Sequence, residues 1–227
     1  VDAEHHLIVA HDVNNIGSDR AQLVPMGEKA LEASGQAAIT VLADRGYYSG
    51  DQIVACEGNG VDPIIPKTET SGGALRGRIM IQDFYYDRDN DRYTCPAGEL
   101  LTQPKKRSTR GPDPDYVRYR NLDACGGCAL KSRCTQERFQ QLRRWKHEDV
   151  LDATQRRLDH MPKAMTVRRR TVEHPFGTIK ASMGATHFLT RTLPKVKTEM
   201  SLQVLAYNLK RMMALFGIRP LIRAMAA

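Results

Sequence analysis

The chain has 227 residues, 41% of them hydrophobic and 26% charged, which is enough to bury the core of one large domain or of one domain with an insertion. No apolar run approaches the roughly 18 residues that a membrane helix needs, so the sequence excludes a membrane span. It begins at Val1 without an initiator methionine or a secretory signal, and we expect it to be a part of something longer.

Charge is divided unevenly along the chain. Residues 1–100 carry 8 Lys and Arg against 16 Asp and Glu, whereas residues 101–227 carry 26 against 10. The basic residues of the second half form four clusters, at 105–107, 143–146, 168–170 and 191–197. Any one cluster alone is more often a solvated surface. Four clusters in one half favour the binding of a polyanion such as nucleic acid.

The first residues indicate a strand followed by a helix. A β-branched run predicts a strand within His6–Val13, closed by a turn. Ser18 or Asp19 then caps a helix that ends near Gly35.

The next segment continues this alternation. Ala38–Ala43 is almost wholly apolar, which predicts a strand buried on both faces, with Asp44 at its carboxyl end. Ser49 or Asp51 begins another helix, and Val61–Ile65 predicts a further strand. The order of strands and helices indicates an α/β sheet.

Residues 68–143 break the pattern with clusters of Gly, Pro, Asp and Lys, and they hold four of the five cysteines. Such a stretch is too long for a plain loop, so we interpret it as an insertion. Helical periodicity returns over Glu148–His160 and Val167–Met183. It ends in an amphipathic helix with apolar residues at Leu202, Leu205, Leu209, Met212 and Phe216.

The four cysteines of the insertion have metal-site spacing. Cys95, Cys125, Cys128 and Cys134 are spaced C-x29-C-x2-C-x5-C, an arrangement that a closed, structural, tetrahedral Zn²⁺ site favours. The alternative is four thiols without a common function. Cys56 lies in a predicted helix among apolar residues and is interpreted as a buried small hydrophobe.

Two further features suggest chemistry but allow plain readings. Asp44 follows a buried strand, where open α/β sheets place active-site groups, yet it is as well placed to cap a turn. Arg169, Glu173 and Lys180 fall within roughly 40° of one another on an ideal helix. A surface ion pair explains that pattern equally well, and Pro175 can kink the helix before Lys180.

Taken together, these motifs resemble the DDE transposases of bacterial insertion sequences. The similarity lies in Ala43-Asp44-Arg45-Gly46-Tyr47, in the cysteine insertion, and in a segment from Arg169 to Lys180 that is similar to a Tyr-Arg-Glu-Lys signature. The stretches 1–19, 144–148 and 199–211 match as well, so the resemblance covers nearly the whole chain.

The resemblance implies a mixed, RNase H-like sheet flanked by helices. It implies a first core part at 1–67, a zinc-binding insertion at 68–143, and a helical remainder at 144–227. In that family three carboxylates hold two Mg²⁺ or Mn²⁺ ions. Asp44 would be the second carboxylate and Glu173 the third, while Arg169 and Lys180 would contact the DNA of the transposon ends.

Two departures qualify the resemblance. Thr166 stands at the signature's Tyr position. The family's first Asp precedes the point where this sequence starts, and Asp2, Asp12 and Asp19 do not match it. We therefore expect the carboxy-terminal part of a transposase that cleaves no DNA by itself.

The resemblance also implies double-stranded DNA as the partner, a homo-oligomer on DNA, and a cytoplasmic, nucleoid-associated location without a membrane. Two other interpretations stay open. One is a non-catalytic, zinc-containing DNA-binding remnant or regulator. The other is a structure-specific nuclease with the same fold.

Overall fold

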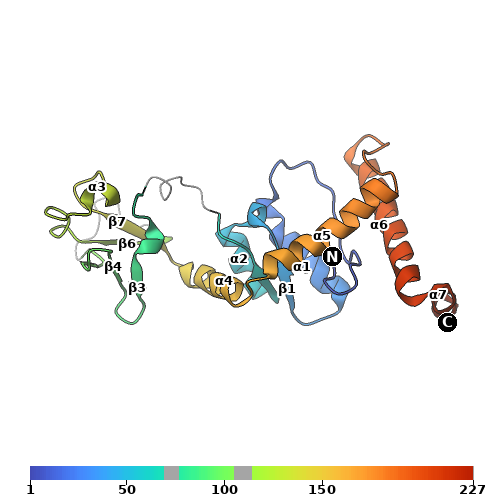
Figure 1. Cartoon of the computed structure of the whole chain (residues 1–227), viewed down its shortest axis with the longest axis horizontal. Helices are drawn as coiled ribbons and strands as arrows, with labels where there is room; N and C mark the ends of the chain where they lie inside the picture. The colour runs from blue at the N-terminus through green and yellow to red at the C-terminus, as the bar shows by residue number, and fades with distance from the viewer. Residues whose placement is uncertain (69–76, 105–113, 227) are drawn as a thin grey trace. The chain divides into compact units, whose positions relative to one another are not determined.

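The computed structural model describes residues 1–68, 77–104 and 114–226 (Figure 1). The chain folds as two compact units: Val1–Thr68 with Val150–Ala227, and Glu69–Asp149. The sequence placed the corresponding boundaries after residues 67 and 143. The basic cluster at 105–107 lies outside the described residues.

The first unit begins with an alternation of short helices and parallel strands. In chain order these elements are η1 (Asp19–Ala21), α1 (Leu23–Ser34), β1 (Ile39–Leu42), η2 (Arg45–Tyr47), α2 (Gly50–Gly58) and β2 (Val61–Ile64). Ser18 caps η1, and α1 ends at Gly35, whose φ of 63° suits a residue without a side chain. The helix predicted from Ser18 or Asp19 is divided, because Ser18 caps only η1 and α1 begins separately at Leu23. The other predicted elements, β1, α2 and β2, are confirmed.

The core of this unit lies between β1, β2 and the two helices that precede them. It consists of Leu23, Ala43, Ile53, Cys56, Val61 and Ile65. Burial, and then the charge of Glu28, raises the pKa of the Cys56 thiol to about 11. The thiol therefore stays neutral and packs as an apolar group, as the sequence predicts.

The strand predicted over His6–Val13 is wrong. The segment is extended, but its backbone is bound by side chains of a helix that comes about 200 residues later. Asn208 accepts from the Ile8 N–H at 2.9 Å and donates to its carbonyl at 2.9 Å. Tyr207 donates to the carbonyl of His6 at 2.7 Å, and Arg211 to that of His5 at 2.7 Å. Backbone groups that a neighbouring strand would bind are satisfied in this way by side chains.

The expectation that β1 is buried on both faces is also wrong. Thr40 is exposed and its neighbours in the strand are only partly buried. Among the described strands, β1 pairs only with β2, in a parallel register that joins Ile39 to Val61 and Leu42 to Ile64. The α/β class is confirmed, whereas within the described ranges the sheets are small and no RNase H-like mixed sheet is present.

The second half of the first unit is helical, as the sequence predicts. It contains α4 (Glu148–His160), α5 (Ala164–Gly177), the π-helical turn η5 (Thr178–Ser182), α6 (Leu193–Phe216) and α7 (Ile218–Met225). Pro175 lies inside α5 without ending it, and the wide turn follows directly. Lys180 lies in that turn, so its seven-residue offset from Glu173 is not that of an ideal α-helix. No helix in the described part of the chain is long and apolar enough to cross a membrane.

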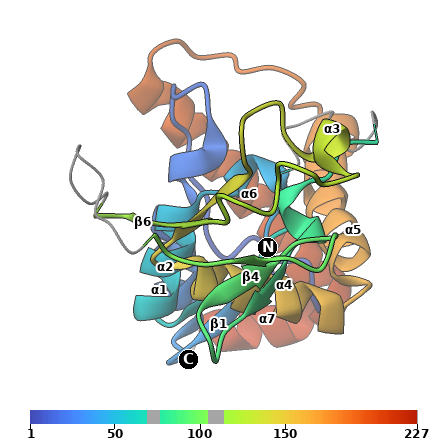
Figure 2. The same cartoon turned by 90° about the vertical axis from the view of Figure 1, so that its left-hand side faces the viewer.

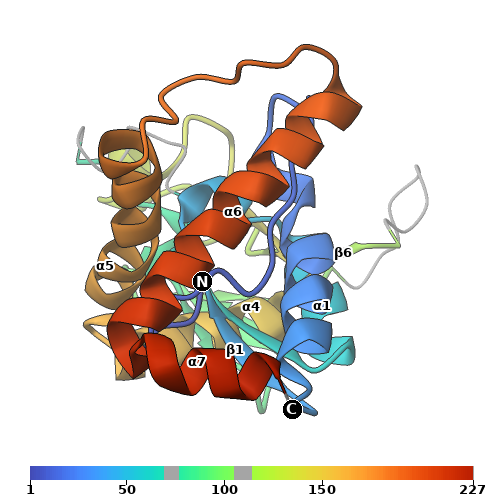
Figure 3. The same ribbon diagram turned by 90° about the vertical axis from the view of Figure 1, so that its right-hand side faces the viewer.

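Helix α6 runs beside the extended amino-terminal segment (Figure 3). Its buried residues are Val204 and Tyr207. Of the apolar positions named from the sequence, Leu202, Leu205, Leu209 and Phe216 are exposed and Met212 is partly buried. The side of α6 that packs against the unit is therefore the one that binds the amino-terminal segment.

The second unit is built from two small antiparallel sheets (Figure 2). One holds β3 (Tyr85–Asp87), β4 (Arg92–Thr94) and β5 (Leu100–Leu101), after the short helix η4 (Ile81–Asp83). The other pairs β6 (Tyr116–Arg120) with β7 (Gln141–Trp145), and α3 (Lys131–Cys134) lies between these strands in the chain. The core of the unit consists of Phe84, Tyr93, Leu101, Tyr119 and Leu142.

Asp12 connects the first helix of the chain to α6. Its carboxylate accepts from Lys29 at 2.6 Å and from Lys197 at 2.9 Å. These two hydrogen bonds, with Lys29 the stronger influence, lower the pKa of Asp12 well below its usual range. The ionised form therefore stabilises the fold at neutral pH.

We expect Asp12→Asn to lower the free energy of unfolding by about 1 kcal/mol, because two partly exposed ion pairs are lost. In thermal melts this corresponds to a drop of about 2–4 °C. The difference from the parent chain should shrink as the pH falls below about 4, the pKa of an unfolded Asp, and vanish below the folded-state pKa. Glu32→Gln, an exposed change on α1, is the control, and an equal effect of both changes would argue against the link.

Candidate functional site

Asp44 lies directly after the carboxyl end of β1, and both of its carboxylate oxygens are occupied. Oδ1 accepts from the N–H of Gly46 at 2.9 Å and so caps η2. Oδ2 accepts from the Arg168 guanidinium at 2.7 Å. The Asp44 side chain is 46% exposed and that of Arg168 26%, so the pair lies at the surface of the unit. The capping interpretation is thus correct. Capping uses Oδ1, and the cation that Oδ2 binds here is the Arg168 guanidinium.

A second carboxylate lies close to Asp44. A Cβ placed on Gly46 would be 3.0 Å from Oδ1 of Asp44 and 4.0 Å from Oδ2 of Asp19. The half-buried phenol of Tyr47 senses both groups: burial raises its pKa most, and the charges of Asp19 and Asp44 raise it further, against the opposing charge of Arg168. The sequence assigned Asp19 only to a helix cap, because a contact between η1 and η2 has no signal in a linear pattern.

Helix α5 packs against β1 through one of its faces (Figure 1). Thr171 and Pro175 are buried, and Arg168 projects from the same face toward Asp44. Glu173 and Arg169 are exposed on the adjoining face. Within the described ranges Glu173 forms no ion pair, so the surface pair that the sequence allowed between Arg169 and Glu173 is not present.

The structure therefore joins Asp44 to Arg168, a contact that the sequence interpretation missed. The available signal was the spacing of Arg168, Thr171, Val172 and Pro175, which places them on one face of a helix. That pattern shows which residues of α5 share a face, but not that Asp44 lies opposite.

The described residues do not complete a metal site. No three His, Cys, Asp or Glu side chains in the described ranges lie close enough together to hold a metal ion. Carboxylate oxygens are the ligands that Mg²⁺ and Mn²⁺ prefer. The Asp44 carboxylate attracts a cation, because the Arg168 guanidinium binds to it. Asp44 and Glu173 thus fit a divalent ion in chemical type, but they form an incomplete set of ligands.

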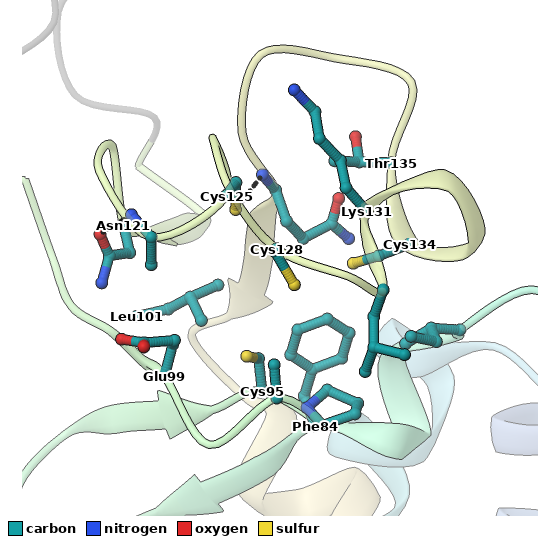
Figure 4. A pocket seen from close by; sticks show the side chains of 16 residues that line it. Phe84, Cys95, Glu99, Leu101, Asn121, Cys125, Cys128, Lys131, Cys134 and Thr135 are labelled. Atoms are coloured by element: carbon teal, nitrogen blue, oxygen red, sulfur yellow. Dashed lines mark hydrogen bonds between the residues drawn. The ribbon is translucent and has the colours of Figure 1, made fainter.

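The four cysteines of the second unit gather around one small space (Figure 4). Cys95 follows β4, Cys125 and Cys128 lie in the loop after β6, and Cys134 ends α3. They line a cavity of about 30 Å³ together with core residues such as Phe84. The four cysteines thus share one cavity, but no three of them lie close enough together to form a metal site in the described ranges.

Local hydrogen bonds fix the backbone of Cys95 and the sulfur of Cys125. Gly98 donates to the carbonyl of Cys95 at 2.8 Å in a tight turn, and the N–H of Gln140 points to Sγ of Cys125 at 3.4 Å. Burial raises the pKa of Cys134, and the nearby thiols of Cys125, Cys95 and Cys128 raise it further. Without a cation the Cys134 thiol is held neutral. A bound Zn²⁺ would favour the thiolate form instead.

Several basic residues of the predicted DNA-binding clusters serve the fold instead. Arg144 is 8% exposed, donates to Asp149 at 2.6 Å and lies 3.8 Å from the ring centre of Tyr86. Lys146 pairs with Asp115 at 2.7 Å. Lys197 and Arg168 likewise bind carboxylates, so these four residues form ion pairs within the fold. The described members of the clusters that are exposed are Arg143, Lys146, Arg169, Arg170, Arg191, Lys195 and Lys197, to which the signature adds Lys180.

Comparison with known proteins gives one match. A family model described as the transposase DDE domain matches residues 94–213, more than half of the chain. That segment contains the four cysteines of the second unit and α5 with Glu173, while Asp44 precedes it. Searches of curated proteins and of solved structures found no match.

Transposases act on DNA, and DDE domains generally use divalent metal ions. A match of this extent supports a transposase function and an enzyme of the nuclease or transferase type. The chain belongs to the family of transposase DDE domains.

Proposed function

We propose that this chain contributes to metal-dependent DNA cleavage and strand transfer in the transposition of an insertion sequence. The observation that carries the proposal is the position of Asp44 after β1, beside a helix whose exposed face bears Glu173 and Arg169. The family match covers that helix. An RNase H-like core is part of the proposal.

In this function Asp44 and Glu173 hold Mg²⁺ or Mn²⁺. When bound, such ions activate a water or a 3′-hydroxyl and stabilise the leaving oxygen of a phosphodiester. Arg169 and Lys180 hold the backbone of duplex DNA by neutralising phosphates next to the carboxylates. A homo-oligomer would allow two DNA ends to be held at once.

A pair of metal ions needs more carboxylates than these two. The described residues provide no group of three possible ligands, and Asp19 beside Asp44 does not complete one. We therefore expect the isolated chain to cleave no DNA, because a shared ligand of the metal pair is missing. A further carboxylate has to be brought to Asp44 before the chemistry can proceed.

We further propose that Cys95, Cys125, Cys128 and Cys134 bind a structural Zn²⁺ ion. Their common cavity and the thiol chemistry support it, since four thiolates form a closed tetrahedral site. This small unit has five buried hydrophobic core residues, so burial supplies only a part of the free energy that folding needs. Binding of the ion would supply the rest.

The competing candidate is a non-catalytic DNA-binding protein. The Arg168 guanidinium favours it, because it occupies the Asp44 oxygen that a metal ion would need. The double variant D44N/E173Q separates the two. If the carboxylates hold the catalytic ion, Mn²⁺ binding followed by electron paramagnetic resonance should weaken by an order of magnitude or more, because two oxygen ligands are lost. Affinity for a labelled DNA duplex should not weaken.

The matched control is E32Q/D51N, which removes two exposed carboxylates on α1 and α2. Equal Mn²⁺ binding by both double variants would contradict the catalytic proposal and leave DNA binding as the function. Plasmid nicking by the parent chain that is abolished by Glu173→Gln would contradict the expected inactivity.

A further inference from the structure

The loop of residues 183–192 joins η5 to α6 and exposes two large apolar side chains that are neighbours in the sequence (Figure 3). Phe188 is 48% exposed and Leu189 is 82% exposed. Apolar residues scattered singly over a surface need no explanation, whereas contiguous ones point to a partner. The contacts that hold this loop, and the charges around it, indicate which partner fits.

Glu199 of α6 holds the backbone of this apolar pair. Its Oε1 accepts from the Leu189 N–H at 2.8 Å, and its Oε2 accepts from the N–H and the hydroxyl of Thr190 at 2.8 Å and 2.7 Å. The hydrogen bonds from Leu189 and Thr190 lower the pKa of Glu199, so the carboxylate is ionised at neutral pH. A segment that is already ordered loses little conformational entropy on binding, so the loop is preorganised.

Both ends of the loop are fixed as well. The N–H of Ala185 donates to the carbonyl of Ile179 in η5 at 3.1 Å. At the other end Thr192 has a φ of 74°, a strained conformation for a β-branched residue, and its carbonyl accepts from the Val196 N–H at 3.0 Å. Strain of this kind persists only where the surrounding contacts impose it. The loop is therefore a defined structure that presents its apolar pair to solvent.

The charges around the loop suit a polyanion. Arg191, Lys195 and Lys180 are exposed, and none of the three forms an ion pair in the part of the chain that the structure describes. Glu199 is the only carboxylate within residues 178–200, and the loop occupies both of its oxygens. The free charge beside the apolar pair is thus positive. Because the chain belongs to a transposase family, DNA is the polyanion that these charges match.

We propose that Phe188 and Leu189 form a wedge that enters duplex DNA between base pairs, while Arg191 and Lys195 hold the flanking phosphates. An apolar wedge unstacks one base step and bends the duplex, and this costs least where the step is flexible or a base is already unpaired. The loop would thus favour deformable DNA without reading base edges. The inference rests on the DNA-binding part of the proposed function and not on its metal chemistry.

The test compares two labelled duplexes of one sequence, fully paired or with a central unpaired bulge, in buffer without Mg²⁺ or Mn²⁺. The parent chain should bind the bulged duplex about tenfold more tightly. F188S/L189S should abolish that preference and leave the salt dependence of affinity unchanged, because it removes no charge. The matched control, L202S/L205S, replaces two exposed leucines of α6 and should keep the preference.

Glu199→Ala separates the wedge from a simple effect of charge. The change removes a negative charge from a basic surface, so electrostatics alone would tighten the binding of both duplexes equally. If the wedge operates, the loop loses the contacts that order it, and the preference for the bulged duplex should fall severalfold although the paired duplex binds no more weakly. An equal rise of both affinities would overturn the proposal.

The remaining outcomes separate this inference from the proposed function. Equal affinity of the parent chain for both duplexes, unchanged in F188S/L189S, would overturn the wedge and leave DNA binding in place. No binding of either duplex would overturn both. If F188S/L189S loses affinity for anionic lipid vesicles while its DNA affinities match those of the parent chain, the partner of the loop is a membrane surface and the proposal is overturned. Thermal melts check that each variant retains its fold.

Discussion

Purified chain should contain a single zinc ion, and Cys128→Ser should abolish that zinc and unfold the unit that holds β3 to β7. Cys128 lines the same cavity as the other three cysteines, so its loss opens the proposed tetrahedral site. Structural zinc contributes roughly 10–16 kcal/mol of apparent binding free energy in small domains, which is the largest single term available to this unit.

Zinc content measured by mass spectrometry, and limited proteolysis, provide the readouts. Cuts within 77–149 should appear in the Cys128→Ser variant and after treatment of the parent chain with a strong chelator. Cys56→Ala is the matched control, because that buried thiol lies in the core of the other unit and should leave zinc content unchanged. Parent protein that folds without zinc and resists proteolysis would show that burial alone stabilises the unit.

Arg168→Gln should raise the affinity of the chain for Mn²⁺ about fivefold, whereas Arg169→Gln should leave it unchanged. The Arg168 guanidinium lies 2.7 Å from the Asp44 oxygen that a metal ion needs. An ion pair of this exposure is worth up to about 1 kcal/mol, which sets the size of the gain. The adjacent Arg169 is exposed, and Asp44 pairs with Arg168 and not with it.

The same two variants should have the opposite order of effects on DNA. Arg169→Gln should weaken duplex binding and reduce the dependence of log affinity on log salt concentration by about one phosphate contact. Arg168→Gln should leave that slope unchanged, because its charge is already held by a carboxylate. If both variants change Mn²⁺ and DNA binding alike, then Arg168 and Arg169 act only as two equivalent surface charges.

The elements that the sequence predicts well are those whose signals are local. Ser18 and Gly35 mark the ends of the first helical segment through their own side-chain chemistry and backbone preference, and the apolar run of β1 needs no partner to be recognised. Each of these features can be read within a few residues.

The features that the sequence misses depend on contacts between distant segments. His6–Val13 has the composition of a strand, but pairing requires a free edge beside it, and side chains of α6 took that place. Arg144 looks like a phosphate ligand until the positions of Tyr86 and Asp149 are known. The link from Arg168 to Asp44 spans 124 positions of the sequence. Composition gives no information on such pairs.

The hydrogen bonds between the amino-terminal segment and α6 also set the order in which the molecule can form. Ile8 and Asn208 are 200 positions apart, so a nascent chain emerges with its first residues unpaired until the last long helix has left the ribosome. β1 and β2, by contrast, are close in sequence and can pair early. During synthesis the β1–β2 pair and its flanking helices can therefore form before the amino-terminal segment is fixed against α6.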